Sequence, residues 1–529
     1  MWQILSDLTS KVKHVSVRTQ SDILLQAASS SGITTKGMSK SNVHRVRKKV
    51  VHEHAEKARQ IVRDKRGSDM VLHYDGKVVE EYTEEKKLKK ERLAVSITCK
   101  GKHFLLGVPS CTDATGEKQY EKIIDLLQKY QIKDDIKGLV FDTTASNTGK
   151  DKGVNSRLNQ YVERPVLHLA CRHHVYECHI KNVAKIFRQT VGPENPLFKK
   201  LLDKFSELEI DQTKLVKFQY GKSDQLDSAA AKSLKIISEL LTQDQIPRGD
   251  YKELAMLVQF YLDPNVGNLK IRQPGAVHHA RFMAQSIYYM KLKILSDIVK
   301  IGSTANIKKG IYAISEFVAH FYAKWFLKAS VAVISPRSDL EAISEMIAYK
   351  ECRPQIASKC LKSMENHSWY LHPSLIPLSL VDPEVPNDLK AEIAQNFFNE
   401  LDKGNISLIY EKINISSIIN DPGDSLTLVQ FVGRSSKTIF DLIGLDVEHL
   451  EWMNIPPDQW EKLNGFRRFR DFVNQLPVTN DSAERNVKLV QDFIDGFRTE
   501  ESRQDLFLAV ENKRKALSSD SSGKKKSKM

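Results

Sequence analysis

The chain has 529 residues, of which 41% are hydrophobic, and this is enough to bury sizeable cores in roughly two to four domains. Its formal net charge of +14 at pH 7 favours a polyanionic partner, most simply DNA, because each neutralised phosphate releases counterions. A basic protein without such a partner is the plainer alternative. No apolar run reaches the roughly eighteen residues of a membrane span, so we expect no membrane partner.

The six cysteines are scattered, and none lies within the first 98 residues, so neither a disulfide framework nor an N-terminal zinc finger is expected. The first residues, MWQILSDLTSKVKH, lack the basic, apolar and small-residue order of a secretory signal. We therefore expect an intracellular protein. The basic stretches at 513–515 and 524–528 indicate either nuclear import, and hence a nuclear protein, or a solubilising tail.

Residues 1–67 are predicted to form a basic helical region. The stretch from Met38 to Lys49 begins with serine caps and continues with the pattern of a basic helix. This helix could be the second helix of a helix-turn-helix, or it could simply present a solvated face. In the first case four side chains would contact DNA: Arg45, Arg47, Lys48 and Lys49.

Residues 68–189 are predicted to form the first part of an α/β core. Short apolar and β-branched runs indicate five strands, at 70–74, 93–98, 103–108, 138–141 and 165–170. The second and third strands are joined by a short turn and should form a hairpin. Apolar residues at helical spacing predict an amphipathic helix around 120–127, and a second helix should follow the fifth strand.

The predicted order, β-β-β-α-β and then β-α, is that of ribonuclease H, with a mixed sheet in which the first and fourth strands are neighbours. Asp75 ends the first predicted strand and Asp142 ends the fourth, so we expect the two carboxylates to lie close together. Each aspartate also has a simpler interpretation, because Asp75 could begin a turn and Asp142 could cap a loop.

Residues 190–470 show helical periodicity with charged faces and are predicted to be a large all-α insertion, which makes the chain mostly helical. The core should resume over 471–515, where Asp481 and Ser482 cap a helix. Glu484 lies in the first turn of this helix, where the helix dipole favours a negative charge. Residues 516–529 are rich in serine and lysine and are predicted to be a disordered basic tail.

Three carboxylates that meet at one edge of a sheet can hold two Mg²⁺ ions, which prefer oxygen ligands and can clamp both the attacking and the leaving oxygen of a phosphodiester. We expect Asp75, Asp142 and Glu484 to be these ligands, with Mn²⁺ as an alternative metal. Cys171 and His174 have part of the spacing of a zinc site, to which His179 could contribute. Alternatively, Cys171 is simply packed in the core and the histidines near it are polar residues without a metal.

Several sequence blocks together resemble hAT-superfamily transposases. They are Phe141-Asp142 with its Thr/Ser-rich loop, the C-x-x-H element Cys171–His174, and the block Asn480-Asp-Ser-Ala-Glu484-Arg485. The stretch His278–Phe282 lies where that family has an Arg-Trp element. The resemblance covers about residues 70–497, and it implies a DDE nuclease in which Asp75, Asp142 and Glu484 form the triad.

By the same resemblance, Cys171 and His174 are the family's C-x-x-H pair, and His279 and Arg281 contact DNA near the cleavage site. The implied function is that of a transposase-like DNA-binding protein with metal-dependent cleavage and strand transfer, acting as a monomer or a homo-oligomer. The alternative is a catalytically inactive derivative that binds nucleic acid or protein.

Overall fold

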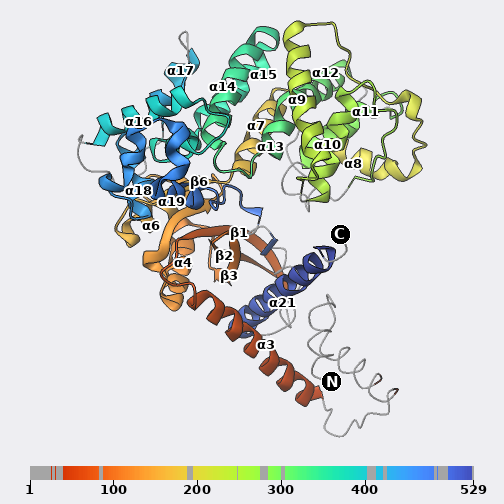
Figure 1. Ribbon diagram of the computed structural model, residues 1–529. Coiled ribbons are helices and arrows are strands. Elements are labelled where there is room, and N and C mark those ends of the chain that lie inside the picture. Colours follow the sequence, from red (N-terminus) through yellow and green to blue (C-terminus); the bar gives the residue numbers. More distant parts are fainter. Residues whose placement is uncertain are drawn as a thin grey trace. The chain divides into compact units, whose positions relative to one another are not determined.

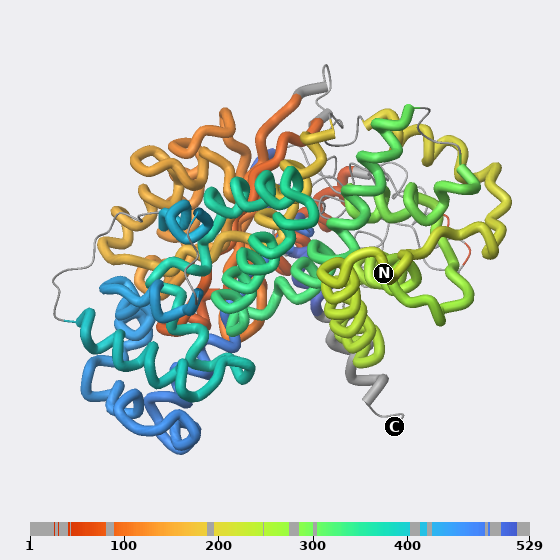
Figure 2. Tube along the Cα trace, turned by 90° about the horizontal axis from the view of Figure 1, so that it is seen from above, coloured from red at the N-terminus to blue at the C-terminus, as the bar shows by residue number. Residues whose placement is uncertain are grey.

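The computed structural model divides into two compact units (Figures 1 and 2). It describes residues 40–82, 87–187, 195–246, 248–274, 284–299, 304–401, 413–420, 426–481, 485–486 and 499–526, with single positions 26 and 30. The first unit combines described residues before 170 with those from 475 onward, and the second lies between them in sequence. Residues 170–187, which we predict to belong to the core, therefore group with the second unit.

The first unit is built on a mixed sheet of six strands in the order β3-β2-β1-β5-β6, with β4 pairing β2. The strands are β1 (Met70–Tyr82), β2 (Lys87–Cys99), β3 (Lys102–Gly107), β4 (Ser110–Cys111), β5 (Ile136–Phe141) and β6 (Leu167–Ala170). β2 pairs antiparallel with β1 and β3, whereas β1 and β5 are parallel. The predicted hairpin and the predicted neighbourhood of the first and fourth predicted strands, which are β1 and β5, are thus confirmed.

The prediction that the first strand ends at Asp75 is wrong. β1 continues to Tyr82 because every residue from Met70 to Tyr82 pairs with β2. Beyond the central sheet the two strands form a hairpin arm (Figure 2), and opposite charges face each other across it at Glu80 and Lys89. Asp75 therefore lies inside a strand, at a point where β5 has already ended.

Helices α4 (Gly116–Tyr130), α5 (Ala145–Thr148) and α6 (Val154–Val162) belong to the same unit. The predicted amphipathic helix corresponds to α4, which buries Ile123 and Leu127 and begins at the cap Thr115. α6, a helix of nine residues that follows the glycine-containing loop after Asp142, was not predicted from the sequence.

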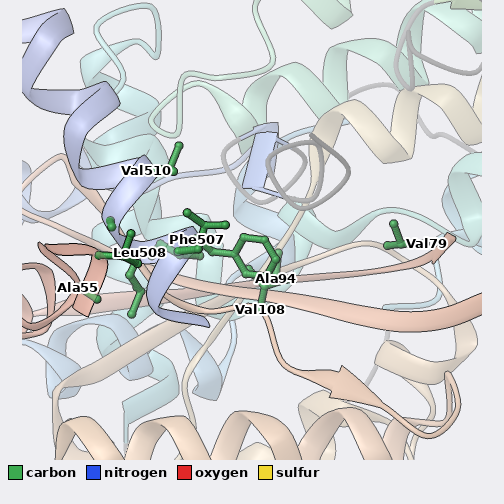
Figure 3. Close-up of a cluster of buried hydrophobic side chains, with 11 residues drawn as sticks. Ala55, Val79, Ala94, Val108, Phe507, Leu508 and Val510 are labelled. Atoms are coloured by element: carbon green, nitrogen blue, oxygen red, sulfur yellow. The ribbon is translucent and has the colours of Figure 1, made fainter. Parts of the chain in front are cut away.

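Helices α3 (Lys40–Arg63) and α21 (Glu500–Lys526) lie side by side (Figure 1). Their apolar side chains share a buried cluster with residues of the sheet, including Val79, Ala94 and Val108, and Phe507 of α21 inserts among them (Figure 3). The described helix α21 extends to Lys526, and the disordered basic tail over 516–529 stays a prediction. Once a helix has formed, each added residue loses its conformational freedom but gains one backbone hydrogen bond, so extension is easier than nucleation.

Helix α21 also covers the outer edge of the sheet. The Gln504 side chain accepts a hydrogen bond from the Val108 N–H (2.6 Å) and donates one to the Val108 carbonyl (2.7 Å). Lys515 Nζ donates to the His103 carbonyl in β3 at 2.5 Å. These side chains occupy backbone groups that an edge strand would otherwise offer to another chain.

The second unit contains helices and no strand among its described residues, in agreement with the predicted all-α insertion. Its α-helices are α7 (Arg172–Ile186), α8 (Pro196–Lys204), α9 (Asp224–Thr242), α10 (Gly249–Leu262), α11 (Ala284–Ile294), α12 (Ala305–Phe317), α13 (Ala323–Leu327), α14 (Ser335–Cys352), α15 (Pro354–Glu365), α16 (Asn387–Leu401), α17 (Ser416–Asn420), α18 (Thr438–Leu442) and α19 (Asn464–Val473). Across the described part of the chain, each helix is too short or too polar to span a bilayer.

The pairing of α3 with α21 depends on a buried ion pair. Arg59 bonds to Asp505, and their side chains are 7% and 9% exposed. The second oxygen of Asp505 lies 2.7 Å from His52 Nδ1. Asp505→Ala removes the buried partner of Arg59 and leaves only Glu56, a 46% exposed side chain at 2.9 Å, so we expect the free energy of unfolding to fall by about 2–3 kcal/mol in urea titrations.

The double variant Arg59→Met/Asp505→Leu removes both charges and should recover most of this loss. Lys118→Met, which breaks a pair with Glu121 on the exposed face of α4, serves as the control and should leave the urea midpoint unchanged. An Asp505→Ala midpoint equal to that of the control would show that the ion pair does not hold the two helices together.

Candidate functional site

The two predicted aspartates lie on neighbouring parallel strands. β1 and β5 are paired up to His73 and Val140. Continued by two residues, this register sets Asp75 beside Asp142, across a strand spacing of about 4.8 Å. Asp75 belongs to β1, whereas Asp142 directly follows the last residue of β5. The structure thus brings together two residues that are far apart in the sequence.

The residues just before the two aspartates support this register. The rings of Tyr74 and Phe141 are stacked with their centroids 6.5 Å apart, and the Tyr74 hydroxyl bonds to Asn155 of α6. Burial raises the pKa of Tyr74 well above its ordinary value, and the nearby charge of Asp142 raises it further. Because side chains alternate along a strand, Asp75 faces the side of the sheet opposite to Tyr74.

The carboxylate of Asp142 is held by the turn that follows it. Its Oδ1 atom accepts hydrogen bonds from the Thr144 N–H (3.2 Å), the Thr144 hydroxyl (2.6 Å) and Asn147 Nδ2 (2.6 Å). No hydrogen bond to Oδ2 is formed within the described part of the chain. Asn147 is buried at the end of this turn, and no role for it was predicted from the sequence.

The two carboxylates suit a divalent cation by their chemistry. Asp75 is 5% exposed, and an acidic group buried close to a second carboxylate is stabilised in its charged form by a cation. Carboxylate oxygens are the ligands that Mg²⁺ and Mn²⁺ prefer, and Oδ2 of Asp142 is not used by the turn. In the described residues no three His, Cys, Asp or Glu side chains gather closely enough to hold a metal ion. Glu484, the third predicted ligand, lies outside these residues.

Asn480 is a further residue of this site, for which the sequence predicted no role. It is 3% exposed and donates from Nδ2 to the Tyr74 carbonyl at 3.0 Å. Its Oδ1 lies 3.3 Å from Nδ1 of His73. Asn480 directly precedes the predicted helix cap Asp481 and begins the block that resembles the family's element with Glu484. The chain segment that leads toward Glu484 therefore contacts β1 next to Asp75.

The region of the predicted zinc pair is packed with aromatic rings. Cys171 is buried at the start of α7, and His173 stacks on Phe326 with ring centroids 4.0 Å apart. His179 is bonded to Ser363 Oγ at 2.9 Å, so it has a structural partner in α15. Zinc at Cys171 and His174 stays a prediction.

Of the four basic residues predicted to contact DNA in α3, Arg45, Lys48 and Lys49 are exposed. Arg47 is 5% exposed, and burial lowers its pKa to about 10. Arg47 is therefore less accessible than its three basic neighbours, and its contact with DNA stays a prediction. Helical periodicity explains this burial, because Arg47 and the buried Val51 are four residues apart and lie on the same face of α3.

The other expected DNA contacts, His279 and Arg281, lie outside the described residues. So do the residues before 40 other than positions 26 and 30, and a helix-turn-helix around α3 stays untested.

No protein-family model matches the sequence, and a search of the curated proteins finds no match.

The pKa of His179 predicts a dependence of stability on pH. Burial, and secondarily the neighbouring His367, lower this pKa well below its ordinary value. The unfolded chain then binds a proton that the folded chain does not, so stability is full above about pH 6.5 and falls as the pH drops toward the folded-state pKa. His179→Gln should make this fall shallower, by up to about 1.4 kcal/mol per pH unit.

Urea midpoints measured between pH 7.5 and 5 would check this expectation. The matched control is His44→Gln at an exposed position of α3, which should retain the wild-type slope. A His179→Gln slope equal to that of the wild type would contradict the assignment of His179 as a neutral core residue.

Proposed function

We propose that this chain is a transposase-like or transposase-derived DNA-binding protein whose first unit is a ribonuclease-H-like nuclease of the DDE kind. The observation that carries the proposal is the parallel pairing of β1 with β5, which ends at His73 and Val140, two residues before Asp75 and Asp142. The strand order β3-β2-β1-β5-β6 supports it. In this order β1 pairs with β2 in a hairpin on one side and with the parallel strand β5 on the other, and a parallel neighbour requires a crossover connection. The resemblance of the sequence blocks to hAT transposases adds the third carboxylate, Glu484.

In this proposal Asp75, Asp142 and Glu484 supply the oxygen ligands for Mg²⁺ or Mn²⁺. When bound, two such ions lower the pKa of a water molecule and neutralise charge on the phosphate. The water oxygen forms a bond to phosphorus, and the bond from phosphorus to the leaving sugar oxygen breaks, with that oxygen taking up a proton. A DNA 3′-hydroxyl in place of water gives strand transfer. Such a protein would act in the nucleus, as a monomer or a homo-oligomer.

Replacement of either aspartate should abolish cleavage. We expect Asp75→Asn and Asp142→Asn to lower the rate of Mg²⁺- or Mn²⁺-dependent nicking of supercoiled plasmid at least about a hundredfold, because each loses a charged metal ligand worth several kcal/mol in the transition state. The matched control is Asp113→Asn, an exposed aspartate of the same unit. Equal nicking by all four proteins would end the catalytic assignment.

A second candidate is a catalytically inactive derivative that binds nucleic acid or protein. The observation that favours it is the turn at Asp142, in which Oδ1 accepts three hydrogen bonds, as an aspartate with a purely structural role would do. DNA binding without metal-dependent nicking, in a wild-type protein that is folded, would select this candidate.

Both candidates predict DNA binding that depends on salt. Arg45, Lys48 and Lys49 are exposed on one helix, so the triple replacement by glutamine should reduce the slope of log affinity against log salt by about 2–3. Lys200, Lys350 and Lys359 are exposed in the second unit, and their triple replacement is a control with the same change of charge. Fluorescence anisotropy with labelled duplex DNA measures both slopes. Equal slopes for the two variants would exclude α3 as the binding surface.

A further inference from the structure

The face of β1 that carries Asp75 also carries a chain of buried polar groups. His73 lies two residues before Asp75 on the same face, and it is 1% exposed. One ring nitrogen contacts Asn480 and the other contacts Thr98 Oγ1 of β2, at 2.8 Å. A buried polar chain of this kind costs stability unless each member is satisfied, and apolar residues would fill the same space more simply.

The hydrogen bonds in this chain have a fixed direction. The Asn480 amide nitrogen donates to the Tyr74 carbonyl, which leaves its oxygen, Oδ1, to accept from His73. His73 must then carry its proton on Nδ1, and Nε2 accepts from the Thr98 hydroxyl. The three side chains thereby tie the segment at 480 to two strands of the sheet.

The Tyr74 carbonyl belongs to the peptide group that joins Tyr74 to Asp75. The parallel pairing with β5 ends at His73 and Val140, one residue earlier. Asn480 thus supplies a donor to β1 immediately beyond the last residue that β5 holds. The hydrogen bond from Asn480 therefore holds the backbone next to Asp75 at the point where β5 no longer pairs with β1.

We infer that Asn480, held by His73, is a positioning residue for the metal ligand Asp75, an inference that rests on the proposed nuclease function. Asn480 does not touch the reacting atoms. It orients the peptide next to Asp75 and so sets the direction from which this carboxylate approaches a divalent cation. Groups that orient a metal ligand in this way typically contribute tenfold to a hundredfold in metal affinity.

The test measures Mn²⁺ binding by electron paramagnetic resonance on the full chain, alongside urea unfolding. Asn480→Ala should weaken Mn²⁺ binding roughly tenfold and raise the Mn²⁺ concentration needed for half-maximal nicking by a similar factor. Thr98→Val is the matched control, because it removes the far end of the polar chain and keeps the bond from Asn480 to Tyr74. It should lose stability but retain the wild-type Mn²⁺ affinity.

Asn480→Ala with wild-type Mn²⁺ affinity would overturn the inference, and so would an equal loss of affinity in Thr98→Val. If Asn480→Ala does not fold, Asn480→Ser gives the same comparison, since the shorter side chain cannot span both partners. A wild type that binds no Mn²⁺ at a site sensitive to Asp142→Asn would overturn the proposed nuclease as well. Failure of the positioning role alone is therefore distinguishable from failure of the function.

Discussion

The parallel pairing of β1 with β5 is the contact on which the first unit depends. Two parallel neighbours cannot be joined by a tight turn, so the intervening chain must leave the sheet and return in the same direction. Here that chain forms β2, β3, β4 and α4 before β5 begins. The pairing brings positions 75 and 142 together and allows Tyr74 to stack on Phe141. A divalent cation held by Asp75 and Asp142 would depend on this strand pair.

The C-terminal part of the first unit completes what the strand pair begins. Asn480 bonds to β1 beside Asp75, Gln504 bonds to the backbone at the end of β3, and Asp505 neutralises Arg59 of α3. Each contact joins residues that are several hundred positions apart, with the helical second unit between them in sequence. The first unit therefore has a closed core although the chain leaves it and returns.

The strands and the longer helices could be predicted from the sequence because their signals are local. Alternating or continuous apolar runs marked the five main strands, and their order indicated which strands are neighbours. The end of β1 was misjudged because its continuation, residues 77–82, is polar and is held by pairing with β2. α6 was missed because its nine residues give too short a periodic pattern.

The candidate site was predictable in part. Asp75 and Asp142 follow from the strand order, but the role of Asn480 depends on a contact with Tyr74 across more than four hundred positions, which no local pattern reveals. The burial of Arg47 could not be predicted for a related reason. Its basic neighbours suggested a DNA-binding surface, whereas the packing of α3 decides which of them face solvent.

The covering of β3 by α21 has a consequence for the order of assembly during synthesis. The helical middle of the chain emerges from the ribosome before residue 500, so α21 cannot cover the edge of β3 until residues 500–515 have been made. Gln504 and Lys515 then close it. An open edge strand invites pairing with other nascent chains. Between the synthesis of β3 and that of α21, the backbone groups of His103 and Val108 lack the side-chain partners that α21 supplies.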